Sequence, residues 1–315
     1  MLGYLVRKTG WTLLVLLVVS VIVSGALRLI PSDAVDLLFQ ADGGSDALKE
    51  EMRRRLGLDR PWPVQYLAWV TGMLQGDFGT SMRTGIPVAR QIVQSMPVTL
   101  ELVLLGTLFG SFGGIVFGIL AARNRGTFWD LLIQPVGLVG LSIPSFWLGS
   151  LLLMGAGLYL PQMRTVGYVG FFEDPLANLS VMLLPALALG LALGSAVMRM
   201  TRTSVLDVMN QDFVRTARAK GLREPAVMRR HILLNSLIPV ITVITIQMGV
   251  LIGGSIVLER VFALPGLGRL LVSAIGERDY TTVQGVTFVL AFAFVMINFA
   301  TDLIYKVLDP RVTVG

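Results

Sequence analysis

Few side chains in this 315-residue sequence have a type and spacing suited to chemistry. Ionisable groups at membrane depth are candidates for proton or ion transfer, and Glu101 and Asp302 are two acids near the ends of apolar stretches. Asp302 precedes Lys306 by four residues, a helical spacing that favours an ion pair. The single histidine, His231, has no second ligand of its type. We therefore predict no catalytic, metal-binding or cofactor-binding residue in this chain.

Motifs that hold nucleotides or activate nucleophiles are also missing from the sequence. It contains no G-x-x-x-x-G-K-[ST] phosphate loop, no G-x-S-x-G nucleophile elbow and no H-E-x-x-H zinc motif. The absence of cysteine excludes disulfides and thiol nucleophiles. The chain is therefore expected not to be an enzyme by itself.

Composition indicates which elements carry these residues. Hydrophobic residues make up 54% of the chain, charged residues only 15%, and the mean hydropathy is +0.73. A soluble domain carries about 25% charged residues, and one crossing of the membrane needs roughly 20 apolar residues. No alternation typical of a β-barrel is present, so we expect an all-α polytopic membrane protein. Six spans are predicted: Trp11–Ile30, Val98–Ala122, Leu131–Leu153, Val181–Met200, Ile238–Leu258 and Val283–Val307.

Basic residues indicate the orientation of these spans. Those on one side are Arg7, Lys8, Arg123, Arg125, the eight from Arg199 to Arg230, Lys306 and Arg311. The short loops on the opposite side hold only Arg164, Arg260, Arg269 and Arg278. Because Lys and Arg accumulate in cytoplasmic loops, both termini should be cytoplasmic. Topology thus explains the net charge of +6, and no nucleic-acid partner is expected.

Three regions follow along the chain: residues 1–30 with the first span, an extracytoplasmic segment 31–96, and a core of five spans in 97–315. Ser24-x-Ala26 resembles a signal-peptide cleavage site, but the apolar run continues to Ile30, so we expect an uncut first span. Cleavage would leave five spans. Within 31–96 we predict a charged helix from Ser45 and an interfacial helix in "DRPWPVQYLAWVTGML". This segment is interpreted as a solvated cap, with a docking surface as the alternative.

Small residues and prolines mark the spans that pack closely or bend. Glycines four residues apart in the second span form a ridge for helix packing: Gly106, Gly110, Gly114 and Gly118, with Gly113 in the same region. Pro144 in "GLSIPSFWLGS" predicts a kink in the third span, which could line a cavity. The candidates for a translocation path are Ser142, Pro144, Ser145, Gln247 and Asn298, chosen as the kink and its polar neighbours at membrane depth.

A polar, basic stretch, "QDFVRTARAKGLREPAVMRR", interrupts the apolar sequence within the cytoplasmic loop at about 201–235. Gln211–Lys220 is predicted to be a helix, which Gly221 ends, and Glu224–Pro225 opens a second helix. The two faces of the first helix hold Phe213, Val214 and Ala217 on one side and Arg215 and Arg218 on the other. Ala217 and Gly221, four residues apart, are expected to form a seam where another protein's backbone can approach.

This hairpin resembles a known motif. "RTARAKGL" followed by "LNSLIPV" is similar to the Glu-Ala-Ala-x-x-x-Gly cytoplasmic loop of ABC importer permeases, with Ala217 and Gly221 matching the second alanine and the glycine. Arg215 and Thr216 replace the glutamate and first alanine, as in the dipeptide/oligopeptide/nickel branch. Further stretches agree, in order through nearly the whole chain: "LGLDRP", "GDFGTS", "SIPSFWLG", "ERVFALPGLGRLL", "DYTTVQG" and "DLIYKVLDPRV".

The resemblance implies the six-helix architecture of a type I ABC importer permease in the bacterial inner membrane. It implies a heterodimer with a homologous second permease, two ABC ATPase subunits that carry ATP and Mg²⁺, and an extracytoplasmic substrate-binding protein. The expected substrates are di- and oligopeptides, with glutathione or nickel as alternatives, moved by alternating access. Coupling to the ATPase would fall on Arg215, Thr216, Ala217, Arg218, Lys220, Gly221 and Leu222.

Two other functions remain open from the residues alone. A proton- or sodium-driven secondary transporter would use Asp302 or Glu101 as its titrating group, but it leaves the hairpin unexplained. A structural membrane scaffold fits poorly with several proline-interrupted spans.

Overall fold

A computed structural model describes residues 2–26, 46–55 and 59–308, and that part of the chain is helical apart from loops and one isolated bridge between Thr80 and Pro87. The helices are α1 (Leu2–Ala26), α3 (Asp46–Arg55), α4 (Trp62–Leu74), α5 (Val88–Arg123), α6 (Phe128–Ser142), α7 (Ser145–Tyr159), α8 (Pro175–Met209), α9 (Asp212–Ala219), α10 (Glu224–Val227), a π-helical segment Met228–Leu233, α11 (Leu234–Val261), α12 (Leu267–Gly276) and α13 (Tyr280–Leu308). The all-α prediction is confirmed.

The structure gives five or six candidate membrane spans in its described part, where the sequence predicts six. Among the described residues, five helices or helix runs are long and apolar enough to cross a membrane, and a bent pair, α6 with α7, brings the number to six if it forms one span. The predicted cleavage-like sequence falls at the end of α1, while residues 27–30 and the expected N-cap Ser45 lie outside the described part. The charged and the Trp- and Tyr-rich stretches form α3 and α4, as expected.

The third span is broken rather than kinked, which corrects the expectation for Pro144. The axes of α6 and α7 meet at 105°. Ile143 and Pro144 both have extended backbone, with ψ of 122° and 133°. Proline disfavours helical geometry in the residue before it and cannot donate a helical hydrogen bond. The helix therefore ends at Ser142, and Pro144 caps a new helix in another direction.

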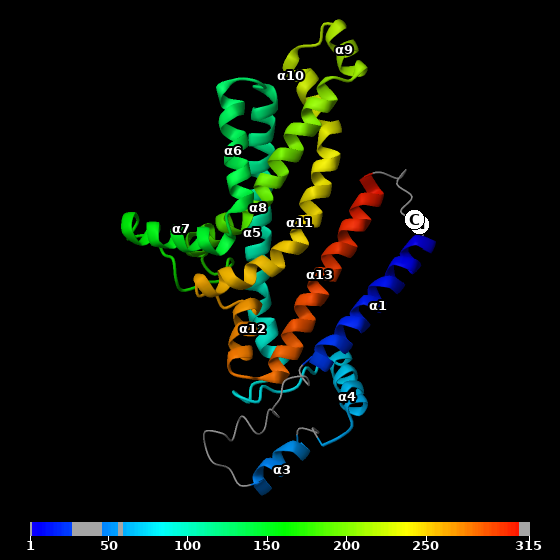
Figure 1. Cartoon of the computed structure of the whole chain (residues 1–315), viewed down its shortest axis with the longest axis vertical. Coiled ribbons are helices and arrows are strands. Elements are labelled where there is room, and N and C mark those ends of the chain that lie inside the picture. Colours follow the sequence, from blue (N-terminus) through cyan, green and yellow to red (C-terminus); the bar gives the residue numbers. More distant parts are fainter. Residues whose placement is uncertain (1, 27–45, 56–58, 309–315) are drawn as a thin grey trace. The chain divides into compact units, whose positions relative to one another are not determined.

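The larger of two compact units, residues 99–264 and 297–315, is built around α8. Helices α6, α7 and α11 pack on α8 (Figure 1). The glycine ridge of α5 also contacts it, from Gly106 against Leu189 to Gly118 against Thr201. From one contact to the next, the residue numbers increase along α5 and along α8 together. The two helices therefore run in the same direction. The predicted packing ridge is confirmed, whereas Gly113 faces open space.

The smaller unit, residues 1–98 and 265–296, is held by polar contacts between helices and loops. Tyr66 of α4 shares a hydrogen bond of 2.8 Å with Ser20 of α1. Buried Asp279 accepts hydrogen bonds from the Ser81 hydroxyl and the Met82 amide, at 2.5 and 3.2 Å. The segment before α13 is thereby fixed to the loop before α5.

Candidate coupling site

The polar stretch after α8 folds as the helix–break–helix that the sequence predicts. Gly221 has φ of +77°, a left-handed conformation that glycine adopts without a steric penalty. The Gly221 amide donates to Arg218 O at 2.9 Å and the Leu222 amide to Ala217 O at 3.4 Å. These two bonds form a Schellman C-cap, which ends α9 and turns the chain toward α10. We call residues 212–227, α9 through α10, the coupling hairpin.

The coupling hairpin is attached to the rest of its unit by an apolar cluster. Its fully or nearly buried members are Ala122, Val205, Val214, Ala217, Val227, Met228 and Ile232. They come from α5, α8, both hairpin helices and the π-helical segment. The hairpin is thus packed on the ends of the long helices α5 and α8.

This packing changes the expected role of Ala217. The alanine is 5% exposed inside the cluster, so it is not part of a seam open to another protein. Its small side chain instead lets α9 lie close to its own core. Phe213, expected on the same face as Val214, is 45% exposed, while Val214 is fully buried. Gly221 remains exposed.

The outer rim of the hairpin is polar and accessible. Its exposed members are Arg215, Thr216, Arg218, Lys220, Gly221 and Leu222. Arg218 donates two hydrogen bonds to Glu224, at 3.2 and 2.8 Å, and these bonds raise the pKa of Arg218. The pair joins α9 to α10 across the break. Six of the seven predicted coupling residues therefore share one exposed rim, and Ala217 lies beneath it.

The helix that carries the hairpin has further polar contacts that the sequence reasoning missed. Ser204 of α8 donates a hydrogen bond of 2.8 Å to the carbonyl of Ser236 in α11. Arg202, one turn earlier than Val205, donates two hydrogen bonds to the 3%-exposed carboxylate of Asp130, at 2.8 and 2.9 Å. Asp130 and Arg202 are 72 positions apart in the sequence, so no local pattern indicates that they pair.

The hairpin joins α11 through a π-helical segment, Met228–Leu233, which the sequence reasoning also missed. Such segments are rare and are found mostly as single turns inside helices, often at functional sites. His231 lies in this segment, half-buried, and its carbonyl accepts a hydrogen bond from Asn235 at 2.6 Å. No group of three or more His, Cys, Asp or Glu that could hold a metal ion occurs in the described part of the chain.

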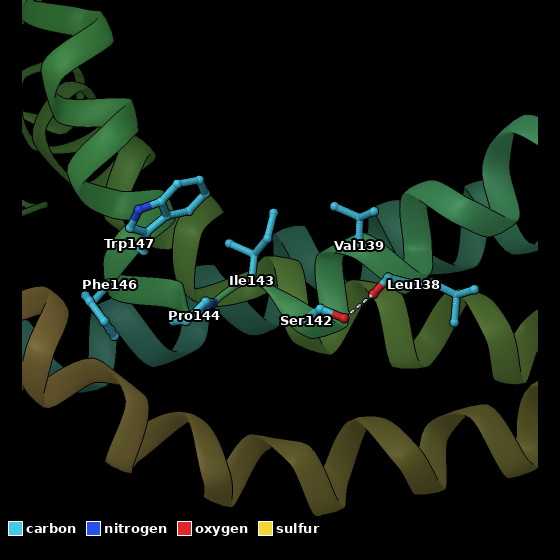
Figure 2. Close-up of a pocket in the computed structure, with 7 residues that line it drawn as sticks. All are labelled: Leu138, Val139, Ser142, Ile143, Pro144, Phe146 and Trp147. Carbon is cyan, nitrogen blue, oxygen red and sulfur yellow. Dashed lines mark hydrogen bonds between the residues drawn. The ribbon is translucent and has the colours of Figure 1, made fainter.

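The candidate path residues are only partly brought together. A pocket of about 510 Å³ lies at the bend between α6 and α7, lined by Leu138, Val139, Ser142, Ile143, Pro144, Phe146 and Trp147. Figure 2 shows Ser142 and Pro144 on either side of Ile143, with the Ser142 hydroxyl bonded back to Leu138 O at 3.1 Å. Ser145 follows Pro144 in the chain but is not among the residues that line the pocket. Gln247 of α11 and Asn298 of α13 are half-buried.

Glu101, one of the two acids considered for ion coupling, is held by a hydrogen bond. Glu101 accepts a hydrogen bond of 2.7 Å from the Tyr168 hydroxyl, and its other carboxylate oxygen is buried. Burial, and then this hydrogen bond, raises the pKa of Tyr168. The side chain of Asp302 lies outside the described ones.

Two family models match the chain. Residues 114–314 match the binding-protein-dependent transport system inner membrane component, and residues 1–103 match the N-terminal part of such membrane components. The chain belongs to this family of importer permeases. The expected resemblance is thereby confirmed, and the protein is an ABC importer permease of the dipeptide/oligopeptide family.

Relatives cover this permease end to end. It is 39% identical to a putative peptide transport system permease of Brucella suis and 35% identical to the dipeptide transport system permease DppB of Escherichia coli K12. It is 38% identical to the glutathione transport system permease GsiC of Salmonella paratyphi A, and each match covers 99% of both chains. The fold of a chain from the inward-facing MetNI methionine ABC transporter is similar, with a TM-score of 0.56, 20% identity, and coverage of 69% of this chain and 96% of that one.

Proposed function

We propose that this permease moves di- or oligopeptides inward, by alternating access driven by ATP hydrolysis in partner subunits. The observation that carries the proposal is the coupling hairpin, with its core packed on α5 and α8 and its rim exposed. A docking element needs both properties, because it must present a surface to a partner and transmit the partner's displacement.

The partners follow from this role. A homologous second permease would complete a heterodimer in the bacterial inner membrane. Two ABC ATPase subunits would bind ATP and Mg²⁺ and contact the rims, and an extracytoplasmic binding protein would deliver the peptide. The excess of basic residues beside the hairpin supports an orientation with both termini in the cytoplasm. Peptide is preferred over glutathione because peptide permeases recur among the relatives named above. Nickel remains the third alternative.

The mechanism assigns different tasks to the residues of the hairpin. Arg215, Arg218 and Lys220 offer charged donors to a groove of the ATPase, while Gly221 lets the rim backbone approach closely. Ala217 acts from below by seating α9 on Val205. When ATP closes the two ATPases, the seated hairpin would pull α8 and α11, and these would rearrange the spans around the path.

The test is purification of the tagged permease from its native membrane in mild detergent, with identification of every co-purifying protein. A second permease and ATPases with phosphate loops are expected. Gly221→Val should abolish uptake and ATPase recovery, because a side chain at φ of +77° costs at least about 1–2 kcal/mol and crowds the rim.

Gly167→Val is the matched control, since Gly167 also has a positive φ, of +86°, and its Cβ position faces open space. Gly167 lies in the loop between α7 and α8, which in this proposal is on the extracytoplasmic side of the membrane. It should keep both ATPase recovery and uptake. Recovery of the permease without any ATPase, with uptake that survives ATP depletion and collapses with an uncoupler, would replace this proposal with an ion-driven transporter.

A further inference from the structure

Helix α6 is attached to α8 in an unusual way. Of its 15 residues only Asp130, Gly137 and Gly140 are buried. A Cβ on Gly137 would meet Met198, and one on Gly140 would meet the Ser195 hydroxyl, so both glycines lie directly against α8. The fully buried residues that α6 brings to this contact are therefore one acid and two glycines, with no large buried side chain of α6 to fix its position along α8.

The acid makes the specific contact of this interface. Both carboxylate oxygens of Asp130 accept from the Arg202 guanidinium, at 2.8 and 2.9 Å. Gln134 and the Gly126 amide complete its shell, each at 3.0 Å. A bidentate pair fixes direction as well as distance, because two parallel hydrogen bonds resist rotation and sliding. The start of α6 is thus pinned to one turn of α8.

That turn of α8 is also where the coupling hairpin is attached. Val205 lies in the apolar cluster with Val214 of α9, and Ser204 is bonded to Ser236 of α11. Thr201 contacts Gly118 of α5. Positions 201–205 of α8 therefore touch the hairpin, α5, α6 and α11 within about one and a half helical turns.

We propose that the Asp130–Arg202 pair is the positioning contact through which movement of the coupling hairpin reaches the bend between α6 and α7. Because α6 runs as one helix from Phe128 to Ser142, with Pro135 inside it, a pull at Asp130 is transmitted to Ser142, where the helix ends and the pocket begins. Without the pair, the buried contact of α6 with α8 consists of Gly137 and Gly140 alone, and no polar bond ties the start of α6 to α8. The inference rests on the proposed function, because it takes ATP-driven hairpin movement as its input.

Two distances distinguish movement of the coupling hairpin from movement of the bend between α6 and α7. The chain has no cysteine, so introduced cysteines can carry spin labels without background. Gln211→Cys with Arg125→Cys, both at exposed positions, reports the hairpin. Leu131→Cys with Leu158→Cys, at side chains 67% and 69% exposed, reports the angle between α6 and α7. Both are measured by pulsed electron resonance on the complete transporter in nanodiscs, without nucleotide and with Mg-ATP plus vanadate.

In the otherwise native protein, Mg-ATP plus vanadate should change both distances. In Asp130→Asn the hairpin distance should still change, while the change across the bend falls to less than about a third. Arg202→Lys keeps the charge but loses the bidentate fork. It should therefore also keep the change in the hairpin distance and lose most of the change across the bend. This variant replaces Asp130→Asn in the test if Asp130→Asn does not assemble. The exchange Asp130→Arg with Arg202→Asp should restore the response of the bend, which simple loss of folding would not predict.

Arg199→Gln is the matched control, because Arg199 is an exposed basic residue one turn away on the same helix. It should leave both responses unchanged. A full response of the bend in Asp130→Asn and Arg202→Lys would overturn the inference and leave the proposed function intact. If the hairpin distance does not respond in the native protein, the proposed function fails and the inference fails with it.

Discussion

Gly114 of α5 and Gly194 of α8 lie so close that a Cβ on Gly114 would be 2.5 Å from the carbonyl oxygen of Gly194. The two helices thus touch backbone to backbone. We expect Gly114→Val to force them apart and to destabilise the protein by about 1–3 kcal/mol or more, the usual cost of an overpacked core. The measurement is the midpoint of thermal unfolding in detergent.

The neighbouring residue provides the control for this prediction. Gly113 has no atom within 4 Å of its ideal Cβ, so Gly113→Val adds the same side chain to the same helix without a clash. It should melt at or slightly above the native temperature, because valine has a higher helix propensity than glycine. Equal losses in both variants would mean that helix contact is not the cause.

The Asp279 carboxylate should hold the loop before α5 closed. Ser81 donates to it at 2.5 Å, and the same Ser81 hydroxyl accepts from the amides of Arg83 and Thr84 at 3.3 and 3.0 Å. Ser81→Ala removes all three bonds, including one to an acid worth about 1.5–3 kcal/mol. We expect trypsin to cut at Arg83 about tenfold faster or more in this variant, since cleavage follows the population of the open loop.

Thr84→Ala tests whether any lost hydroxyl in this loop has the same effect. Thr84 is exposed, and its hydroxyl accepts from the Ile86 amide, at 3.3 Å. Its cleavage rate should stay within about twofold of the native rate. Fast cutting in Thr84→Ala, or slow cutting in Ser81→Ala, would show that Asp279 is not what closes the loop.

Local signals explain why much of the architecture could be predicted from the sequence. Apolar runs of sufficient length gave the spans, and Gly221 and Pro225 gave the break and restart of the hairpin. The glycine spacing in α5 gave its packing face. In each case the signal lies within a short local stretch of sequence, and for the spans lipid as solvent leaves the backbone few alternatives.

The parts that could not be predicted depend on contacts between distant residues. Pro144 indicated a bend, but the 105° angle depends on what α6 and α7 pack against. The sequence predicted Ala217 in a docking seam, because the residues of the apolar cluster that buries it come largely from other helices. Asp130 was not singled out from the sequence, since nothing in its neighbourhood points to Arg202. Spacing shows which residues share a helix face, but not what covers that face.

The burial of Ala217 gives a prediction for the coupling hairpin. Ala217→Leu adds a large side chain to a packed cluster and should loosen α9, at a cost of about 1–3 kcal/mol. Hydrogen exchange of the amides in residues 212–227 should become faster by about tenfold. Ala219→Leu is the control, because Ala219 is exposed on the same helix and should leave exchange unchanged. Unchanged exchange in Ala217→Leu would return Ala217 to the role of a partner-facing residue.

Tyr168 should remain protonated in the folded protein well above the usual tyrosine pKa of about 10. Burial raises the pKa of Tyr168, and the 2.7 Å hydrogen bond to Glu101 adds to this effect. A raised pKa stabilises the fold fully below pH 10, and this contribution is lost as the pH rises through the folded value. Tyr168→Phe should therefore remove the last-rising part of the tyrosinate absorbance titration and lower stability at neutral pH by about 1–3 kcal/mol. If the variant instead loses absorbance that rises near pH 10, the phenol is not held in the buried bond to Glu101.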